Sequence, residues 1–166
     1  MNLGMTTFGA VHTLISLVGI VSGFVVVFGM LNGKRPDAWT AVFLLTTVAT
    51  SVTGFGFPFA VLLPSHKVGI ISLVVLAVAI IARYVRHLAG AWRWIYVVSA
   101  VAALYFNVFV LVVQLFRRVT FLQELAPTQS EPPFAIAQLV VLLLFVWLGI
   151  RAVKGFRTAA VQPAFS

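Results

Sequence analysis

The chain contains no cysteine, and only 8% of its 166 residues are charged. The absence of cysteine excludes disulfides, thiolate nucleophiles, cysteine-ligated zinc and iron–sulfur clusters. Acidic residues are scarce too, with 3 Asp and Glu against 11 Lys and Arg. Little therefore remains for acid–base catalysis, and no Gly-rich phosphate loop, Ser–His–Asp set or HExxH pattern is present. These absences favour a protein that is not an enzyme.

The chain is rich in apolar residues, and 62% of its residues are hydrophobic. Soluble domains carry roughly 25% charged residues, and a soluble core does not absorb this much apolar surface. A net charge of +8 can indicate a nucleic-acid-binding protein. Here the basic residues fall between and beside apolar runs, which indicates orientation in a membrane and no nucleic-acid partner. The N-terminal MNLGMTT has no basic region, so we expect a retained first span and not a cleaved signal.

Five stretches reach the roughly 20 apolar residues that a helix needs to cross the hydrocarbon layer. They cover residues 8–31, 39–63, 66–88, 92–116 and 133–153. The predicted fold is all-α: a single transmembrane domain of five helices over residues 1–157, with a short cytoplasmic tail at 158–166. Around Gly90, only Arg83, Arg86, His87 and Arg93 separate two otherwise continuous apolar runs. A single helix through it would be about 50 residues long and would overshoot the bilayer, so a hairpin is expected.

Basic residues predict the orientation of these spans, since cytoplasmic loops carry an excess of Lys and Arg. One side would carry Lys34, Arg35, Arg83, Arg86, Arg93, Arg151, Lys154 and Arg157, and the other Lys67, Arg117 and Arg118. The richer side is expected to be cytoplasmic, with the N-terminus outside, in a bacterial-type inner (plasma) membrane. Its charge predicts contact with anionic lipid. Trp39, Trp92, Trp94 and Tyr96 are expected at this inner boundary.

One face of the first span carries His12, Ser16, Gly19 and Gly23, at helical spacing. The sequence GIVSG within it is a small-xxx-small pattern, which lets helix backbones approach closely. Ser16, Gly19 and Gly23 are therefore predicted to pack against another helix. That helix can belong to this chain, to a second copy or to a membrane partner; if the two glycines pack inside the monomer, they cannot also form a dimer.

Polar side chains of several spans are expected in the outer half of the bilayer, where they predict a polar pocket. The candidates for binding a cofactor are His12, His66, Gln114, Gln138 and Asn107. Buried amides commonly connect helices, and the alternative is that they orient a ligand. Gly54, Gly56 and Pro58 are expected to weaken the outer end of the second span and make room there. His87 lies at the opposite end, among arginines, and is expected to be an ordinary interfacial residue.

Two histidines on neighbouring helices of an apolar bundle can ligate haem iron. On His12 and the string SHKVGIISL, the chain resembles transmembrane cytochrome b bundles with paired histidines. It is also similar to uncharacterised small bacterial membrane families with one histidine in the first span and another at the start of the third. The resemblance covers spans one to four and implies that His12 and His66 ligate one haem b on the outer side. A second haem is not implied, because His87 has no inner partner histidine.

Other roles remain open at this stage. A metal site without haem lacks a third and fourth ligand, since no carboxylate lies inside a span. A non-enzymatic membrane subunit or scaffold would use the small-residue face of span one. A solute or ion pathway would use the hydroxyl row of Thr46, Thr50 and Thr53 and would need an oligomer, because five spans form a thin wall around a pore.

Overall fold

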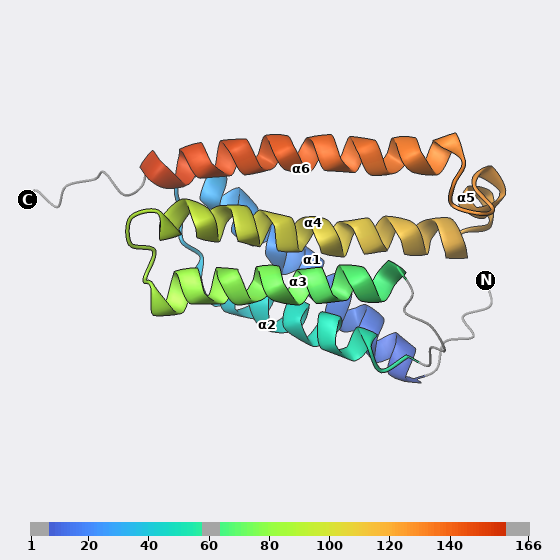
Figure 1. Ribbon diagram of the computed structural model, residues 1–166, viewed down its shortest axis with the longest axis horizontal. Coiled ribbons are helices and arrows are strands. Elements are labelled where there is room, and N and C mark those ends of the chain that lie inside the picture. Colours follow the sequence, from blue (N-terminus) through green and yellow to red (C-terminus); the bar gives the residue numbers. More distant parts are fainter. Residues whose placement is uncertain (1–6, 58–63, 159–166) are drawn as a thin grey trace, which may run out of the picture.

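The computed structural model describes residues 7–57 and 64–158. Over these residues the chain is helical and contains no strand. The elements are α1 (Thr7–Leu31), α2 (Asp37–Gly54), α3 (Pro64–Ile80), the π-helix η1 (Ile81–Val85), α4 (Trp92–Arg118), α5 (Thr120–Leu125) and α6 (Pro132–Thr158). The long helices lie side by side along one axis, and α5 forms a short cap beyond the end of α4 (Figure 1).

Four stretches of the described chain are helical, long and apolar enough to cross a membrane. They are Thr7–Leu31, His66–Val85, Trp92–Arg118 and Pro132–Phe156. The all-helical, multi-pass membrane class predicted from the sequence agrees with this architecture. The remaining long helix, α2, has 18 residues and is more polar, since it starts at Asp37 and carries a row of hydroxyl side chains. It nevertheless packs within the bundle against α1 and α3.

Most helix ends match the breaks in the apolar pattern. α1 and α4 begin and end within two residues of the predicted bounds. The second span ends earlier than expected, because α2 stops at Gly54 and continues only as a turn in which the amide of Gly56 bonds the carbonyl of Thr53. The rest of the predicted span, 58–63, lies outside the described residues. α6 runs five residues past the predicted end at 153, while α5 was not predicted at all.

The reversal around Gly90 is the hairpin expected from the sequence. Three of its residues have positive φ: His87 at 48°, Leu88 at 59° and Gly90 at 53°. The helix before the turn widens into η1, where the amide of Arg86 bonds the carbonyl of Ile81 five residues back. Such π-turns insert an extra residue into a helix and re-aim the side chains that follow. Here η1 carries Arg83, discussed below.

α4 is the central helix of the bundle. In the most apolar stretch of α4, 44% of the residues are buried, whereas in that of α6 only 11% are buried. The core that it shares with α1, α2 and α3 includes the fully buried Val27, Phe43, Leu76 and Leu104. α6 contacts α4 and α1 and leaves its other face uncovered. The two ends of this bundle differ in charge, and each holds a cluster of polar side chains.

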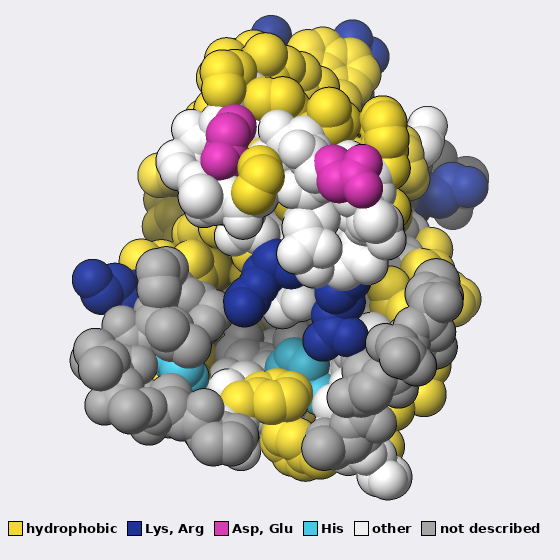
Figure 2. Space-filling model, turned by 90° about the vertical axis from the view of Figure 1, so that its right-hand side faces the viewer, with side chains coloured by type: hydrophobic (Ala, Val, Ile, Leu, Met, Phe, Trp, Pro, Cys, Tyr) yellow, Lys and Arg dark blue, Asp and Glu magenta, His cyan; other side chains and the backbone are white. Residues whose placement is uncertain are grey.

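The basic end is the end at which α1 and α6 terminate and α2 and α4 begin, on the left of Figure 1. It carries Lys34, Arg35, Arg83, Arg86, Arg93, Arg151 and Lys154. The opposite end, capped by α5, is here called the α5 end and is viewed face-on in Figure 2. In that view acidic side chains lie on the upper lobe, Lys and Arg side chains below them, and histidine side chains lower still.

The loop between α5 and α6 is closed by one carboxylate. Glu131 accepts hydrogen bonds from the Thr128 amide at 3.2 Å, the Thr128 hydroxyl at 2.8 Å and the Ser130 amide at 3.1 Å. Desolvation acts to raise the pKa of Glu131, but these hydrogen bonds to the charged form outweigh it and hold the pKa below its usual value of 4.5. The loop therefore has an ordered conformation at neutral pH.

Candidate functional site at the α5 end

His12 lies in the second turn of α1 and meets the end of α2. Its Nδ1 is 2.8 Å from Oγ1 of Thr53. The ring also stands edge-on to Phe57, with the ring centroids 5.1 Å apart. Gly54 lies beside the ring, and a Cβ there would make an ordinary contact with Cε1 of His12 at 3.9 Å. The imidazole of His12 thus lies against the residues at the end of α2.

The hydrogen bonds of Thr53 favour a proton on Nδ1 of His12. The Thr53 hydroxyl donates its proton back to the carbonyl of Ala49 at 2.7 Å, with the carbonyl of Thr50 at 3.3 Å. A hydroxyl has one proton, so toward His12 it can only accept. When the hydroxyl bonds the Ala49 carbonyl, Nδ1–H of His12 donates to Thr53 and Nε2 carries the lone pair. No hydrogen bond to Nε2 is present in the described part of the chain.

His66 reaches the same end of α2 from α3. Its side chain is 5% exposed, and its ring lies 5.6 Å, centroid to centroid, from Phe55. Phe55 in turn packs on Gly69, where a Cβ would come within 3.4 Å of the ring. The segment Thr53–Phe57 therefore touches both predicted histidines, one through Thr53 and Phe57 and the other through Phe55.

The three amides predicted to share the pocket make their hydrogen bonds elsewhere. Asn107 is buried and donates from Nδ2 to Oγ1 of Thr47 at 3.1 Å, which ties α4 to α2. Gln138 donates to the carbonyl of Phe109 at 3.2 Å, which ties α6 to α4, while its Oε1 is buried without a partner. Gln114 accepts from Arg118 within α4 at 3.3 Å. Two of these amides connect helices, and the predicted cofactor role of all three stays a prediction.

The small-residue face of α1 packs inside the monomer. Gly19 and Gly23 are buried, and Ser16 is partly buried. A Cβ on Gly23 would lie 2.6 Å from Leu104 of α4 and 2.8 Å from Phe43 of α2. A Cβ on Gly19 would meet the hydroxyls of Thr46 and Thr47 at 3.2 and 3.3 Å. Because these glycines already hold α2 and α4 close to α1, they cannot also form a dimer interface.

Most hydroxyls in the row on α2 donate hydrogen bonds to carbonyls of their own helix. Thr46 donates to the carbonyl of Val42 at 2.6 Å and Thr53 to that of Ala49 at 2.7 Å, both one turn back. Such bonds need no solute or water. Only Thr50 has a buried hydroxyl without a partner. The row therefore offers few groups that could replace the hydration shell of a passing ion.

The described residues contain no cluster of three or more His, Cys, Asp or Glu side chains able to hold a metal ion. A metal cage built from protein ligands alone is therefore not found in that part of the chain. His87, the remaining histidine, is exposed in the turn at the basic end, just past the helix that was predicted to include it. What the α5 end offers is individual imidazoles beside apolar and aromatic side chains.

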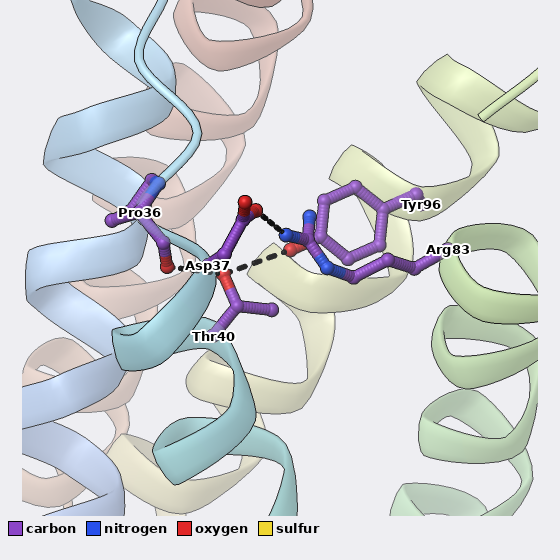
Figure 3. A network of polar contacts seen from close by, with 5 residues as sticks. All are labelled: Pro36, Asp37, Thr40, Arg83 and Tyr96. Carbon is purple, nitrogen blue, oxygen red and sulfur yellow. Dashed lines mark hydrogen bonds and ion pairs between the residues drawn. The ribbon is translucent and has the colours of Figure 1, made fainter. Parts of the chain in front are cut away.

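A second polar cluster lies at the basic end and was not predicted (Figure 3). The guanidinium of Arg83 forms an ion pair with Asp37; the Arg83 side chain is 8% exposed and that of Asp37 is 79% exposed. The Arg83 guanidinium lies over the ring of Tyr96, 5.2 Å from its centroid. The Tyr96 hydroxyl donates to Thr40 at 3.5 Å, and Thr40 donates to the carbonyl of Pro36 at 2.9 Å.

This cluster joins the start of α2 to η1 and α4. It makes Asp37 the counter-ion of a buried arginine. It also corrects one expectation, because Tyr96 is a core residue with 1% exposure instead of an interfacial ring. One sequence signal pointed to it, because Asp37 is the only acidic residue between two groups of basic ones. The cluster satisfies its own charges, so its chemistry is structural.

Comparisons of the chain with protein-family models, with curated proteins and with solved structures found no match. The functional argument therefore rests on the residues of this chain alone.

Proposed function

We propose that this chain is a five-span protein of a bacterial-type inner membrane that binds a single haem b at its α5 end, with His12 as an axial ligand. In this proposal the α5 end faces the periplasm and the basic end faces the cytoplasm, since positively charged loops are retained inside. Haem supplies one-electron chemistry when bound. The chain's own part is to hold an imidazole nitrogen in a fixed direction within an apolar site.

The hydrogen bond between His12 and Thr53 is the observation that carries the proposal. A histidine that ligates a metal donates its other ring N–H to an oxygen, which fixes the ring and raises the basicity of the ligating nitrogen. His12 has this arrangement: Nδ1–H is held by Thr53 at 2.8 Å, and Nε2 keeps its lone pair. The apolar surroundings from Phe57 suit a porphyrin face.

His66 is the proposed second ligand, because it contacts the same end of α2. It comes from α3, so iron bound between the two histidines would link the first and third spans across α2. Its burial favours a ligand that excludes water. With both histidines bound, the haem would be low-spin, and with one it would have an open coordination position.

An optical spectrum tests the haem proposal. We expect the protein, purified in mild detergent from haem-replete cells, to show a Soret band and, after dithionite, sharp α and β bands. His12→Ala is expected to lose haem, and His66→Ala to lose the low-spin bands. Thr53→Val removes the second-shell hydrogen bond and should weaken haem binding roughly 10- to 100-fold. His87→Ala, at the other end of the bundle, is the matched control and should keep the wild-type spectrum. A flat wild-type spectrum with haem supplied contradicts the proposal.

The count of five spans depends on α2, and the lack of cysteine makes it directly testable. We expect single cysteines at Lys34 and Ala89 to react with a membrane-impermeant maleimide only after cell lysis, and one at Ser130 to react in intact cells. If α2 does not cross, the first two positions lie on opposite sides, and one of them reacts in intact cells. All three positions are exposed, so a lack of labelling is not caused by burial.

A second candidate is a non-enzymatic membrane subunit. The observation that favours it is the uncovered face of α6, of whose apolar stretch only 11% is buried. A flat optical spectrum would make this candidate the leading one. A solute pathway has less support, because the hydroxyls of Thr46 and Thr53 are bonded within their own helix.

A further inference from the structure

The short helix α5 exposes apolar side chains although it lies beyond the ends of the long apolar helices (Figure 1). Phe121 is 66% exposed and Leu125 is 42% exposed. The two are four residues apart, which places them on one face of the helix. Val119, immediately before α5, is 42% exposed as well. These three side chains are here called the α5 stripe. A helix surrounded by water usually turns such a face toward the core.

The amide of Gln123 lies on the other side of α5, about 200° around the helix axis from Phe121. It lines a polar hollow of about 420 Å³, together with Arg117 at the end of α4 and Thr128 in the following loop. Glu124 is exposed on a further side. α5 therefore turns one polar side to the protein, one polar side outward and one apolar side outward. Surroundings that are part water and part lipid account for this division of the surface.

The lengths of α4 and α6 locate the boundary of the hydrocarbon core. At the α5 end the rings of Phe116 and Phe134 are in contact, with their centroids 5.4 Å apart. Toward the basic end Trp94 and Lys154 line one groove between the same two helices. At 1.5 Å of rise per residue, α4 covers about 33 Å from Trp94 to Phe116, and α6 covers about 30 Å from Phe134 to Lys154. The hydrocarbon core is about 30 Å thick, and α4 has no charged residue over 95–115. With Trp94 at one boundary, where tryptophan is enriched, the contact between Phe116 and Phe134 lies at the other.

The chain stays close to this boundary on both sides of α5. Arg118, the last residue of α4, lies about 3 Å beyond Phe116 along the helix axis, and α5 begins two residues later. After α5, Gln129 donates from Nε2 to the carbonyl of Val113 at 3.1 Å, so the loop returns to within one turn of Phe116. The headgroup region adds about 5–8 Å on each side of the hydrocarbon core. α5 therefore lies at the height of the headgroups, where its exposed face meets lipid at the edge of the bundle.

We propose that α5 is an interfacial helix, whose α5 stripe is inserted into the lipid surface where headgroups meet acyl chains, while Glu124 faces water. Interfacial helices bury their apolar face about 5–10 Å into this boundary. Lipid contact removes the exposed surface of Phe121 and Leu125 from water, and the loop bonds of Gln129 and Glu131 hold the helix at this height. The inference needs only that α4 and α6 cross a bilayer. It depends neither on haem nor on which side of the membrane the α5 end faces.

Single nitroxide spin labels measure the depth of each face, because the chain has no cysteine of its own. The full chain is placed in vesicles of phosphatidylcholine and phosphatidylglycerol, and power saturation gives the collision rates of the label with oxygen, which is enriched in hydrocarbon, and with a water-soluble nickel complex. We expect the ratio of oxygen to nickel collisions to be several-fold higher for the label in Phe121→Cys than for that in Glu124→Cys. Leu143→Cys on the exposed face of α6 is the mid-membrane reference, and Ser130→Cys is the water reference. All four positions are exposed, so labelling leaves the core intact.

Leu125→Cys should give the same ratio as Phe121→Cys, because the two positions share a face. A ratio for Phe121→Cys equal to that of Ser130→Cys would put the α5 stripe in water and overturn the proposal. A ratio equal to that of Leu143→Cys would put α5 inside the hydrocarbon core and overturn the interfacial position. A label in Phe121→Cys that collides with neither reagent would show that a protein surface covers the stripe, and would overturn lipid as its partner. None of these readouts depends on the haem spectrum, so the two proposals fail separately.

Discussion

Replacing Gly155 by alanine is expected to separate α6 from the end of α1 and to destabilise the protein by about 1–3 kcal/mol, the usual cost of overpacking. A Cβ on Gly155 would lie 2.6 Å from the carbonyl oxygen of Leu31 and 2.8 Å from that of Met30. These are backbone atoms, which cannot turn away as a side chain can. The last carbonyls of a helix lack intrahelical partners, and the glycine lets them approach the backbone of α6.

Gly149→Ala is the matched control, because it lies on the same helix and its Cβ would have only an ordinary contact at 3.6 Å. Alanine favours a helix over glycine by up to about 1 kcal/mol, so this control should be neutral or slightly stabilising. The free energy of unfolding can be compared by titrating SDS into mixed micelles and following tryptophan fluorescence. If the two variants have the same stability, the close approach of α6 to α1 does not exist as described.

Asp37→Asn is expected to lower the free energy of unfolding by about 1–2 kcal/mol. The guanidinium of Arg83 is 8% exposed, so the variant leaves a buried cation without its counter-ion. Hydrogen bonds to charged groups are worth about 1.5–3 kcal/mol, and we expect a value at or below the lower end of that range because Asp37 is 79% exposed and water screens the pair. The loss should shrink in high salt, which screens exposed charges.

The double variant Asp37→Asn/Arg83→Met separates the ion pair from other effects of Asp37. With the cation removed, the second substitution should recover part of the loss, and the coupling energy of the cycle should exceed about 0.5 kcal/mol. Glu124→Gln, an exposed acid at the α5 end, should stay within about 0.5 kcal/mol of the wild type. Additive effects in the double variant would mean that Asp37 and Arg83 act independently, contrary to the contact in Figure 3.

Local signals in the sequence were sufficient to predict where the long helices lie, but not the short helix α5. Helix length and helix ends are set by the apolar run itself and by the Gly, Pro or charged residues beside it, all of which are close in sequence. For this reason α1, α4 and the hairpin at Gly90 agree with expectation. The early end of α2 at Gly54 follows from the glycines that were expected to weaken it. The unpredicted α5 lies in a stretch of mixed polarity, where periodicity is a weak guide.

Contacts between distant residues needed the tertiary structure. Helical periodicity placed His12, Gly19 and Gly23 on one face of α1, but it did not show which helix packs against that face. The partner of His12 is Thr53, 41 positions away. The same holds for Arg83 and Asp37, 46 positions apart, and for Asn107, predicted near the histidines but bonded to Thr47.

The sequence by itself determined that this is a helical membrane protein, because the amino-acid composition of a segment decides whether it is more stable in lipid or in water. It also determined which residue types were available for chemistry, with no cysteine and 3 acids. Only the tertiary structure decided that the glycines of α1 are used inside the monomer, that Thr53 is the partner of His12, and that Arg83 pairs with Asp37. The physical reason is that packing depends on which helix faces are brought together, and a one-dimensional pattern does not contain that information.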